Sequence, residues 1–233
     1  AESFPPQFKA ADGTWYGFAA RARVLLVNTK QVAEDEAPRS MFDLTDAKWK
    51  GKVGIAKPLF GTTATHAACL FAKLGPERAG QFFRDLKKNQ VQILSGNKQV
   101  ALSVGDGTLP LGLTDTDDAI EEVDKGMPVR IVYLDSEADE LGTLFIPNTL
   151  AALRGSPNPA AAERLADYLL SPDVEAALAR GPSAQIPLNP AVTVPVRVAT
   201  PATIQAMQVD FEEAARRWRE TAEFLTEHFV GPE

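Results

Sequence analysis

Short apolar runs alternate with helix-forming stretches between residues 51 and 134, and this alternation constrains the fold more than any other feature. The apolar runs have the length and composition of buried strands, and they cover residues 53–56, 91–94, 109–113 and 129–133. Helix-forming stretches lie between and after them, at residues 64–74, 77–89, 97–104 and 115–125. Because parallel strands need a crossover connection, usually a helix, the pattern predicts an α/β unit with a largely parallel sheet.

The regions on either side follow other patterns. Residues 15–28 are predicted as an extended segment with a buried apolar centre at residues 24–27. Two apolar runs surround Pro147 and Asn148. Helices are predicted further on, separated by Pro-rich irregular chain at residues 181–200, and they cover residues 160–170, 172–180 and 201–229. Leu165 and Tyr168 share the apolar face of the first of these helices.

Composition excludes several classes of protein. The 233 residues carry a formal charge of −7, which argues against a general nucleic-acid or anionic-membrane binder. A single cysteine, Cys69, excludes an internal disulfide and a cysteine-rich zinc cluster. No apolar stretch reaches the roughly 20 residues needed to span a bilayer. Since no basic-then-apolar leader is present at Ala1, we expect either a cytosolic protein or a processed or trimmed product.

Polar side chains gather at three junctions where a predicted strand passes into a helix. The residues concerned are Thr62 and Thr63, then Ser95, Gly96 and Asn97, and finally the run from Thr114 to Asp118, which includes Thr116. In parallel sheets the carboxyl ends of the strands meet, and helix starts there can bind anions. These junctions therefore predict a shared ligand site. The alternative is that the same residue types only cap their own helices.

Three carboxylates stand at the third junction, on Asp115, Asp117 and Asp118. They could ligate a hard cation or pair with an amine, or they could only complement the positive end of a helix. His66, one turn into an apolar helix, is the remaining candidate metal ligand, although a histidine there is more commonly a core or cleft-wall residue. Arg21 shares a strand face with Arg23, where they could bind an anion or form a solvated edge.

No catalytic motif is present in the chain. The sequence contains no G-x-S-x-G, no P-loop, no H-E-x-x-H and no G-x-G-x-x-G. We therefore expect a protein without enzyme activity. An enzyme that uses the aspartates as acid–base groups is an alternative of another class.

Four stretches of the sequence together resemble a known family. They are residues 15–28 (WYGFAARARVLLVN), residues 43–56 (DLTDAKWKGKVGIA), the helix start Ser171 to Glu175, and Pro187-Leu188-Asn189-Pro190. The chain resembles the periplasmic solute-binding proteins of ABC transporters from about Trp15 to Val192, and most of all the ferric-iron-binding type.

The resemblance implies a two-lobed, type II periplasmic-binding-protein fold with solute held between the lobes. Residues 1–30 would be a remnant of the first lobe and a crossing strand, residues 31–134 the second lobe, and residues 135–233 the return to the first lobe and the C-terminal helices. The first lobe would be incomplete, because family chains carry a leading segment that is not matched here. The implied location is periplasmic or extracellular, with a membrane permease as partner.

The chain differs from the ferric-binding members of the family in its candidate metal ligands. Ferric-binding members of the family typically hold the metal with two adjacent tyrosines. This chain has only Tyr16, Tyr133 and Tyr168, and the matching place carries the run from Thr114 to Asp118. Carboxylates would therefore take the place of phenolates.

Three hypotheses follow. In the first, the protein binds iron(III) or another metal ion through the aspartates and His66, with the other junction residues around the solute; a small organic anion or zwitterion, such as an aminophosphonate, is the alternative ligand. No resident cofactor is expected. The second is the enzyme named above, and the third is an interaction module that docks onto another chain.

Overall fold

The fold is built on a six-stranded mixed sheet. The computed structural model describes residues 4–231. Its strands are β1 (Tyr16–Asn28), β2 (Val53–Ala56), β3 (Gln92–Leu94), β4 (Leu111–Asp115), β5 (Val129–Val132) and β6 (Phe145–Leu150). The order β3-β2-β4-β1-β5 places β2 parallel to both β3 and β4, and β1 antiparallel to both β4 and β5. The expected largely parallel α/β unit is confirmed, with one antiparallel strand inserted.

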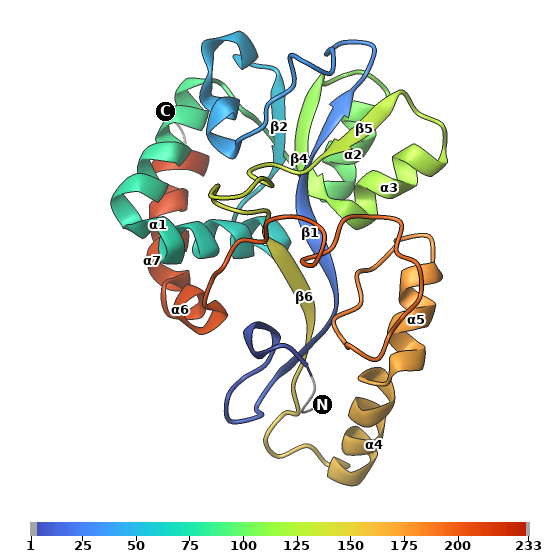
Figure 1. Cartoon of the computed structure of the whole chain (residues 1–233). Coiled ribbons are helices and arrows are strands. Elements are labelled where there is room, and N and C mark those ends of the chain that lie inside the picture. Colours follow the sequence, from blue (N-terminus) through green and yellow to red (C-terminus); the bar gives the residue numbers. More distant parts are fainter. Residues whose placement is uncertain (1–3, 232–233) are drawn as a thin grey trace.

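Strand β1 runs through both halves of the molecule (Figure 1). Its second half pairs with β4 and β5, whereas its first half pairs with β6 below the main sheet. The register shifts between Phe18 and Arg21, where Ala19 has a φ of 46°. The buried carboxylate of Glu175 accepts a hydrogen bond from the Ala19 N–H at 2.6 Å. The bulge lies within the part of β1 that pairs with β6, and the strand passes to the main sheet after Ala22, since pairing with β4 begins at Arg23.

Alternating residues of β1 feed two hydrophobic cores. Leu25 and Val27 join a cluster that includes Phe71, whereas Val24 and Leu26 join a second cluster that includes Val104. The division follows from the two-residue period of a strand, which sends successive side chains to opposite faces. Both faces of the sheet are covered, and this explains why the centre of β1 is apolar at every position.

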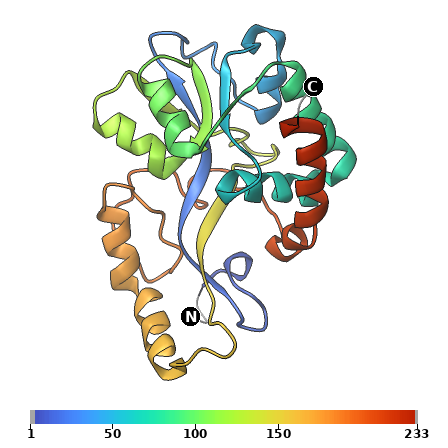
Figure 2. The same ribbon diagram turned by 180° about the vertical axis from the view of Figure 1, so that it is seen from behind.

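Helices cover the two faces of the sheet and continue below it (Figures 1 and 2). They are α1 (Gly61–Lys88), α2 (Asn97–Gly105), α3 (Thr116–Asp124), α4 (Pro159–Leu169), α5 (Pro172–Arg180), α6 (Phe211–Arg216) and α7 (Trp218–Leu225). Helices α2 and α3 pack together, and α6 and α7 pack on α1. Short turns of 3-10 helix at residues 6–8, 41–45 and 47–49 and a π-helical turn at 226–230 complete the described structure. Gly75, with φ 79° and ψ 161°, breaks α1 where the sequence predicts one helix to end and the next to begin.

The prediction of a helix over residues 201–229 is wrong in its first third, because helical structure begins only at Phe211. Residues 201–210 instead run beside the segment before β6. Thr143 donates its N–H to the Gln205 oxygen and accepts from the Met207 N–H, both at 2.9 Å. A Cβ on Gly142 would lie 2.4 Å from the Met207 nitrogen. These pairings over about 60 residues of sequence override the local helical preference.

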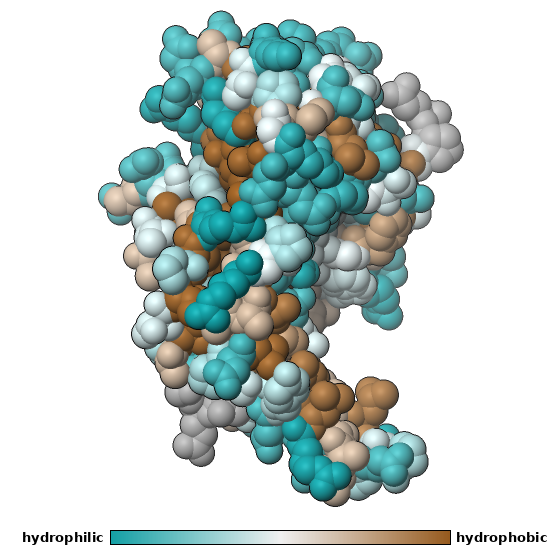
Figure 3. Space-filling model, turned by 90° about the vertical axis from the view of Figure 1, so that its right-hand side faces the viewer, coloured by the Kyte–Doolittle hydropathy of each residue, from teal (hydrophilic) through white to brown (hydrophobic). Residues whose placement is uncertain are grey.

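Helix α4 lies apart from the rest of the molecule. It projects below the sheet (Figures 1 and 2), and every one of its residues is at least partly exposed. Leu165 and Tyr168, which the sequence places on an apolar face, are 56% and 64% exposed. The side view shows apolar residues on the surface of the lower extension (Figure 3). Among residues 4–231, no helix combines the length and apolarity that crossing a bilayer requires.

Candidate functional site

Three helix starts meet at one edge of the sheet. Strands β3, β2 and β4 are neighbours and parallel, so the starts of α2, α1 and α3 lie next to one another. The Asn97 side-chain amide donates to the Thr62 hydroxyl at 2.7 Å and to Asp115 Oδ2 at 2.8 Å. Thr62 donates to the same Asp115 oxygen at 2.5 Å. The expected convergence of the three junctions is therefore confirmed.

Asp115 is the centre of this polar network. Its Oδ1 accepts from Arg23 Nη1 at 2.7 Å, and both side chains of this ion pair are buried. The same Arg23 nitrogen donates to Asn97 Oδ1 at 3.1 Å. Both oxygens of Asp115 thus have partners within the protein. The carboxylate therefore links the starts of α1, α2 and α3, and neither of its oxygens is left without a protein partner.

The polar side chains at the junctions are not helix caps. Helices α1, α2 and α3 have Phe60, Gly96 and Asp115 at their N-cap positions, and in this described part of the chain none of the three forms a side-chain cap hydrogen bond. An uncapped helix start presents backbone N–H groups and the positive end of a dipole. The alternative explanation of these residues as local caps does not hold, and three such starts together can attract an anion.

Asp117 and Asp118 form the acidic side of the site. Ligand oxygens of these two residues and of Asp115 all lie within 4.8 Å of one another. Asp117 Oδ2 is 3.0 Å from Arg21 Nε and accepts from the Gln185 side-chain amide at 3.3 Å, whereas its buried Oδ1 has no partner in residues 4–231. Such an oxygen lacks the hydrogen-bond partner that a buried carboxylate oxygen ordinarily has.

The proton affinities of these carboxyls are raised. Burial raises the pKa of Asp117, with the guanidinium of Arg21 opposing that effect. Burial, and then the charges of Asp117 and Asp115, raise the pKa of Asp118 to about 6, while Lys98 lowers it. Groups with raised proton affinity at a cluster of like charge are typical of sites where a cation replaces the proton.

The other predicted residues of the junctions lie around the network. Thr63 is buried and donates to Asn97 Oδ1 at 3.1 Å. The Thr116 hydroxyl accepts from the Ala22 N–H at 3.1 Å, which ties the start of α3 to β1. Ser95 is exposed, and Gly96 is the N-cap residue of α2. Thr63 and Thr116 therefore support the network from inside the protein.

His66 is not part of the group of carboxylates. It is buried and lines a small space of about 10 Å³, together with Arg23, Leu113, Leu134 and Asp135 among others. Burial, and to a smaller extent the charge of Arg23, lower the pKa of His66 to about 3. The imidazole is a neutral cleft-wall residue, so the structure does not bring this predicted metal ligand to the aspartates.

Sequence analysis missed two polar residues that connect the network to the crossing strands. Asn148 on β6 accepts from Arg21 Nη2 at 2.7 Å, donates to the Ala19 oxygen, and donates to Gln185 Oε1 at 3.2 Å. Gln185 lies in irregular chain, next to Ile186, which forms an isolated β-bridge with Ala20 of β1. No local sequence pattern therefore marked Gln185. Only the position of Asn148 beside Pro147 in an apolar run could have pointed to a special role.

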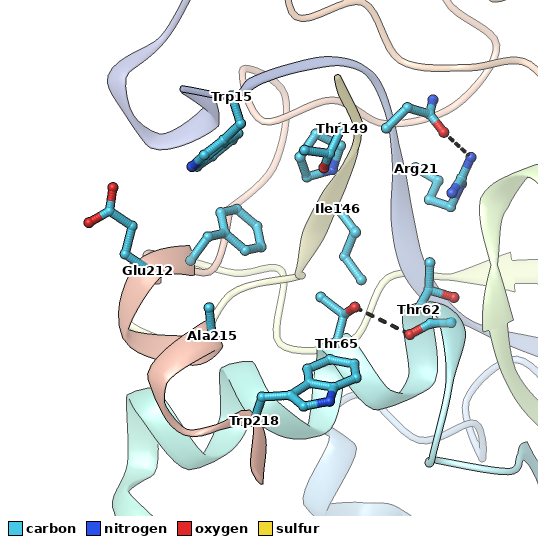
Figure 4. A pocket seen from close by; sticks show the side chains of 13 residues that line it. Trp15, Arg21, Thr62, Thr65, Ile146, Thr149, Glu212, Ala215 and Trp218 are labelled. Atoms are coloured by element: carbon cyan, nitrogen blue, oxygen red, sulfur yellow. Dashed lines mark hydrogen bonds between the residues drawn. The ribbon is translucent and has the colours of Figure 1, made fainter. Parts of the chain in front are cut away.

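An open pocket of about 590 Å³ adjoins the network (Figure 4). Thr62 and Arg21 belong to both, and Trp15, Phe211 and Trp218 line the other end of the pocket. The aromatic residues come from opposite ends of the sequence. Trp218 falls within the helix predicted for residues 201–229, and no pattern in the sequence predicted this pocket.

Comparison with known proteins supports this description. The sequence profile described as "Bacterial extracellular solute-binding protein" matches residues 2–215. This chain belongs to that family.

Named relatives of this solute-binding protein include an iron uptake protein and an Fe(3+)-binding periplasmic protein. Iron uptake protein A2 of Synechocystis is 24% identical over 238 residues, covering 97% of this chain and 67% of the relative. The Fe(3+)-binding periplasmic protein of Serratia marcescens is 28% identical over 108 residues, covering 46% of this chain and 31% of the relative. The chain spans only 54% and 55% of two further curated relatives.

Solved structures share the fold. Apo FutA2 from Synechocystis superposes with a TM-score of 0.83 at 20% identity, covering 97% of this chain and 74% of its own. Iron-bound HitA from Pseudomonas aeruginosa also gives 0.83, at 22% identity and 95% and 72% coverage. AfuA from Actinobacillus pleuropneumoniae, with fructose 6-phosphate bound, gives 0.85 at 21% identity and 99% and 74% coverage. The type II periplasmic-binding-protein fold is confirmed, while the division at residues 30 and 134 stays a prediction.

Proposed function

We propose that this protein is the solute-binding component of an ABC importer and that it binds a metal ion, with iron(III) as the first candidate. The observation that carries the proposal is the convergence of three carboxylates at the sheet edge, their ligand oxygens within 4.8 Å. Hard cations prefer oxygen ligands of this kind. Relatives named as iron-uptake and ferric-iron-binding proteins favour the same solute. The metal would be cargo, not a resident cofactor.

The three carboxylates have different roles in this proposal. Asp117 and Asp118 are the proposed metal ligands, because Asp117 Oδ1 is buried without a partner among the described residues and the Asp118 carboxyl has a raised pKa. Asp115 positions Thr62 and Asn97, since both its oxygens are already engaged. Ser95 and Gly96, at the start of α2, are further proposed contacts of the solute. His66 is left out of the ligand set.

A small organic anion or zwitterion is the second candidate solute. Three uncapped helix starts and two arginines surround the carboxylates, so an acidic group and an amine could both be accommodated. An aminophosphonate has this combination of charges. Delivery to a membrane permease, a periplasmic or extracellular location and the absence of enzyme activity belong to the same proposal.

Calorimetry of chelator-stripped protein tests both candidates. Ferric citrate and 2-aminoethylphosphonate are titrated into the natural chain and into the variants Asp117→Asn and Asp118→Asn. Asp167→Asn is the matched control, because Asp167 is exposed on α4. Loss of ferric binding in the two site variants but not in the control is expected. Binding of neither ligand, or equal binding by all variants, would overturn the proposal.

A further inference from the structure

The pocket beside the polar network combines an aromatic end with a cationic end. Its volume of about 590 Å³ lies within the range of roughly 300–1,000 Å³ that small-molecule sites occupy. Trp15 and Trp218 lie toward one end and Arg21 and Thr62 toward the other (Figure 4), and Phe211 also lines the pocket. A metal ion with water or a small oxyanion would occupy only a fraction of this space.

The aromatic end has rings that are incompletely covered by the protein. Trp218 is 43% exposed, and Trp15 and Phe211 are half-buried. The ring of Phe211 packs against the ring of Phe8, and the two ring centroids are 6.2 Å apart. In Figure 4 the indoles of Trp15 and Trp218 lie at opposite sides of the pocket, with Ile146 between them on the floor. Aromatic faces spaced around a cavity favour a planar guest, which they contact by stacking or edge-to-face packing.

The other end of the pocket carries the guanidinium of Arg21, which is also the ion-pair partner of Asp117. The guanidinium of Arg21 is fixed there, with its Nη2 on Asn148 at 2.7 Å and its Nε 3.0 Å from Asp117. Thr62 lies in the first turn of α1, whose N-terminus has no side-chain cap, so this helix start also borders the pocket. Glu212 lines the opposite, aromatic end and is exposed. This separation of charge orients an anionic guest with its oxygens toward Arg21 and away from Glu212.

We propose that the pocket binds an aromatic anion with adjacent oxygen donors, an ortho-hydroxy aryl carboxylate or a catecholate. The ring lies between Trp15 and Trp218, and the oxygens face Arg21. This inference rests on the proposed solute-binding function and specifies its solute: the guest is either the free aromatic acid or the same acid chelating iron(III).

Intrinsic fluorescence provides a direct assay. The chain has three tryptophans, of which Trp15 and Trp218 line the pocket and Trp49 is buried elsewhere. The probes are 2,3-dihydroxybenzoate alone, the same acid with iron(III), cyclohexanecarboxylate as a non-aromatic acid, and ferric citrate. We expect saturable quenching by one or both dihydroxybenzoate probes, confirmed by calorimetry, and no response to cyclohexanecarboxylate.

Two variants and a control locate the site. Trp218→Ala should weaken dihydroxybenzoate binding by about 2- to 10-fold, the effect of one aromatic contact. Arg21→Gln should weaken it by about 10-fold or more, because a charged hydrogen-bond donor is lost. Tyr168→Ala removes an exposed aromatic ring on α4, outside the pocket, and should change nothing. Thermal unfolding of each variant checks that the fold is retained, and calorimetry replaces fluorescence for Trp218→Ala.

The outcomes separate this inference from the proposed function. Binding of free acid only, or of the ferric complex only, supports the inference and identifies which form is recognised. Binding of ferric citrate without any dihydroxybenzoate probe overturns the inference and leaves the metal-binding function standing. Equal binding of cyclohexanecarboxylate, or no effect of Trp218→Ala and Arg21→Gln, also overturns it. If no probe binds, both the inference and the proposed function fail.

Discussion

Replacing Asp115 by asparagine should lower the stability of the fold, because Asp115 is the buried partner of Arg23. The side chains of this pair are 5% and 1% exposed, and the contact between Arg23 Nη1 and Asp115 Oδ1 is 2.7 Å. Two further nitrogens of Arg23, Nε and Nη2, already have no partner within residues 4–231. Without the carboxylate, the guanidinium would be a buried cation with no counter-charge.

The expected loss follows from that burial. Breaking a buried ion pair by changing one partner costs about 3–5 kcal/mol, because the remaining charge is left uncompensated. A chain of this length loses about 2–4 °C in Tm per kcal/mol, so we expect a decrease of about 6–20 °C. The asparagine oxygen can still accept from Thr62 and Asn97, so the loss arises chiefly from the charge.

Thermal and urea unfolding at neutral pH, followed by circular dichroism, measure this loss. The control Asp167→Asn makes the same chemical change at an exposed position and should leave Tm unchanged. The double variant Arg23→Met with Asp115→Asn removes both charges and should be more stable than Asp115→Asn alone. A loss below about 1 kcal/mol for Asp115→Asn, or strictly additive losses in the double variant, would refute this reasoning.

Three further predictions concern pH and the crossing strand. Iron affinity, measured by calorimetry between about pH 4.5 and 7.5, should fall as the pH drops through about 6, where Asp118 takes up a proton, and Asp118→Asn should flatten that dependence. The unfolded chain protonates His66 near its ordinary pKa of about 6.5, whereas the folded chain holds that pKa at about 3. Stability should therefore decline as the pH falls below about 6.5, and less so in His66→Leu; identical acid-unfolding curves would contradict this. Glu175→Ala removes the buried acceptor of three backbone N–H groups and should cost about 3 kcal/mol or more in urea unfolding, whereas a change within the error of the natural chain would show that the bulge at Ala19 holds without it.

The sequence by itself determined the local elements and their order. Strand β2, helix α2 and helix α3 lie within a few residues of their predicted positions, and the break at Gly75 falls where Gly75-Pro76 predicts it. These features depend on side-chain periodicity and backbone preference over a few neighbouring residues. The order of strands and helices also predicted that the junctions at Thr62 and Asn97 meet, because parallel strands share one carboxyl edge.

Tertiary structure decided what those junctions do. Local sequence marked Asp115 and His66 alike as ligand candidates, yet one is engaged by Arg23 from β1 and the other is enclosed away from the aspartates. The pocket likewise depends on bringing Trp15 and Trp218, from opposite ends of the sequence, to the walls of one cavity. Such contacts join residues up to about two hundred positions apart. Local propensities depend on neighbouring residues only, so they do not predict which distant residues meet. The polar network and the pocket therefore arise from two tertiary features: β1 lies between β4 and β5, and α6 and α7 pack on α1. Burial of the apolar residues on both faces of the sheet stabilises this arrangement.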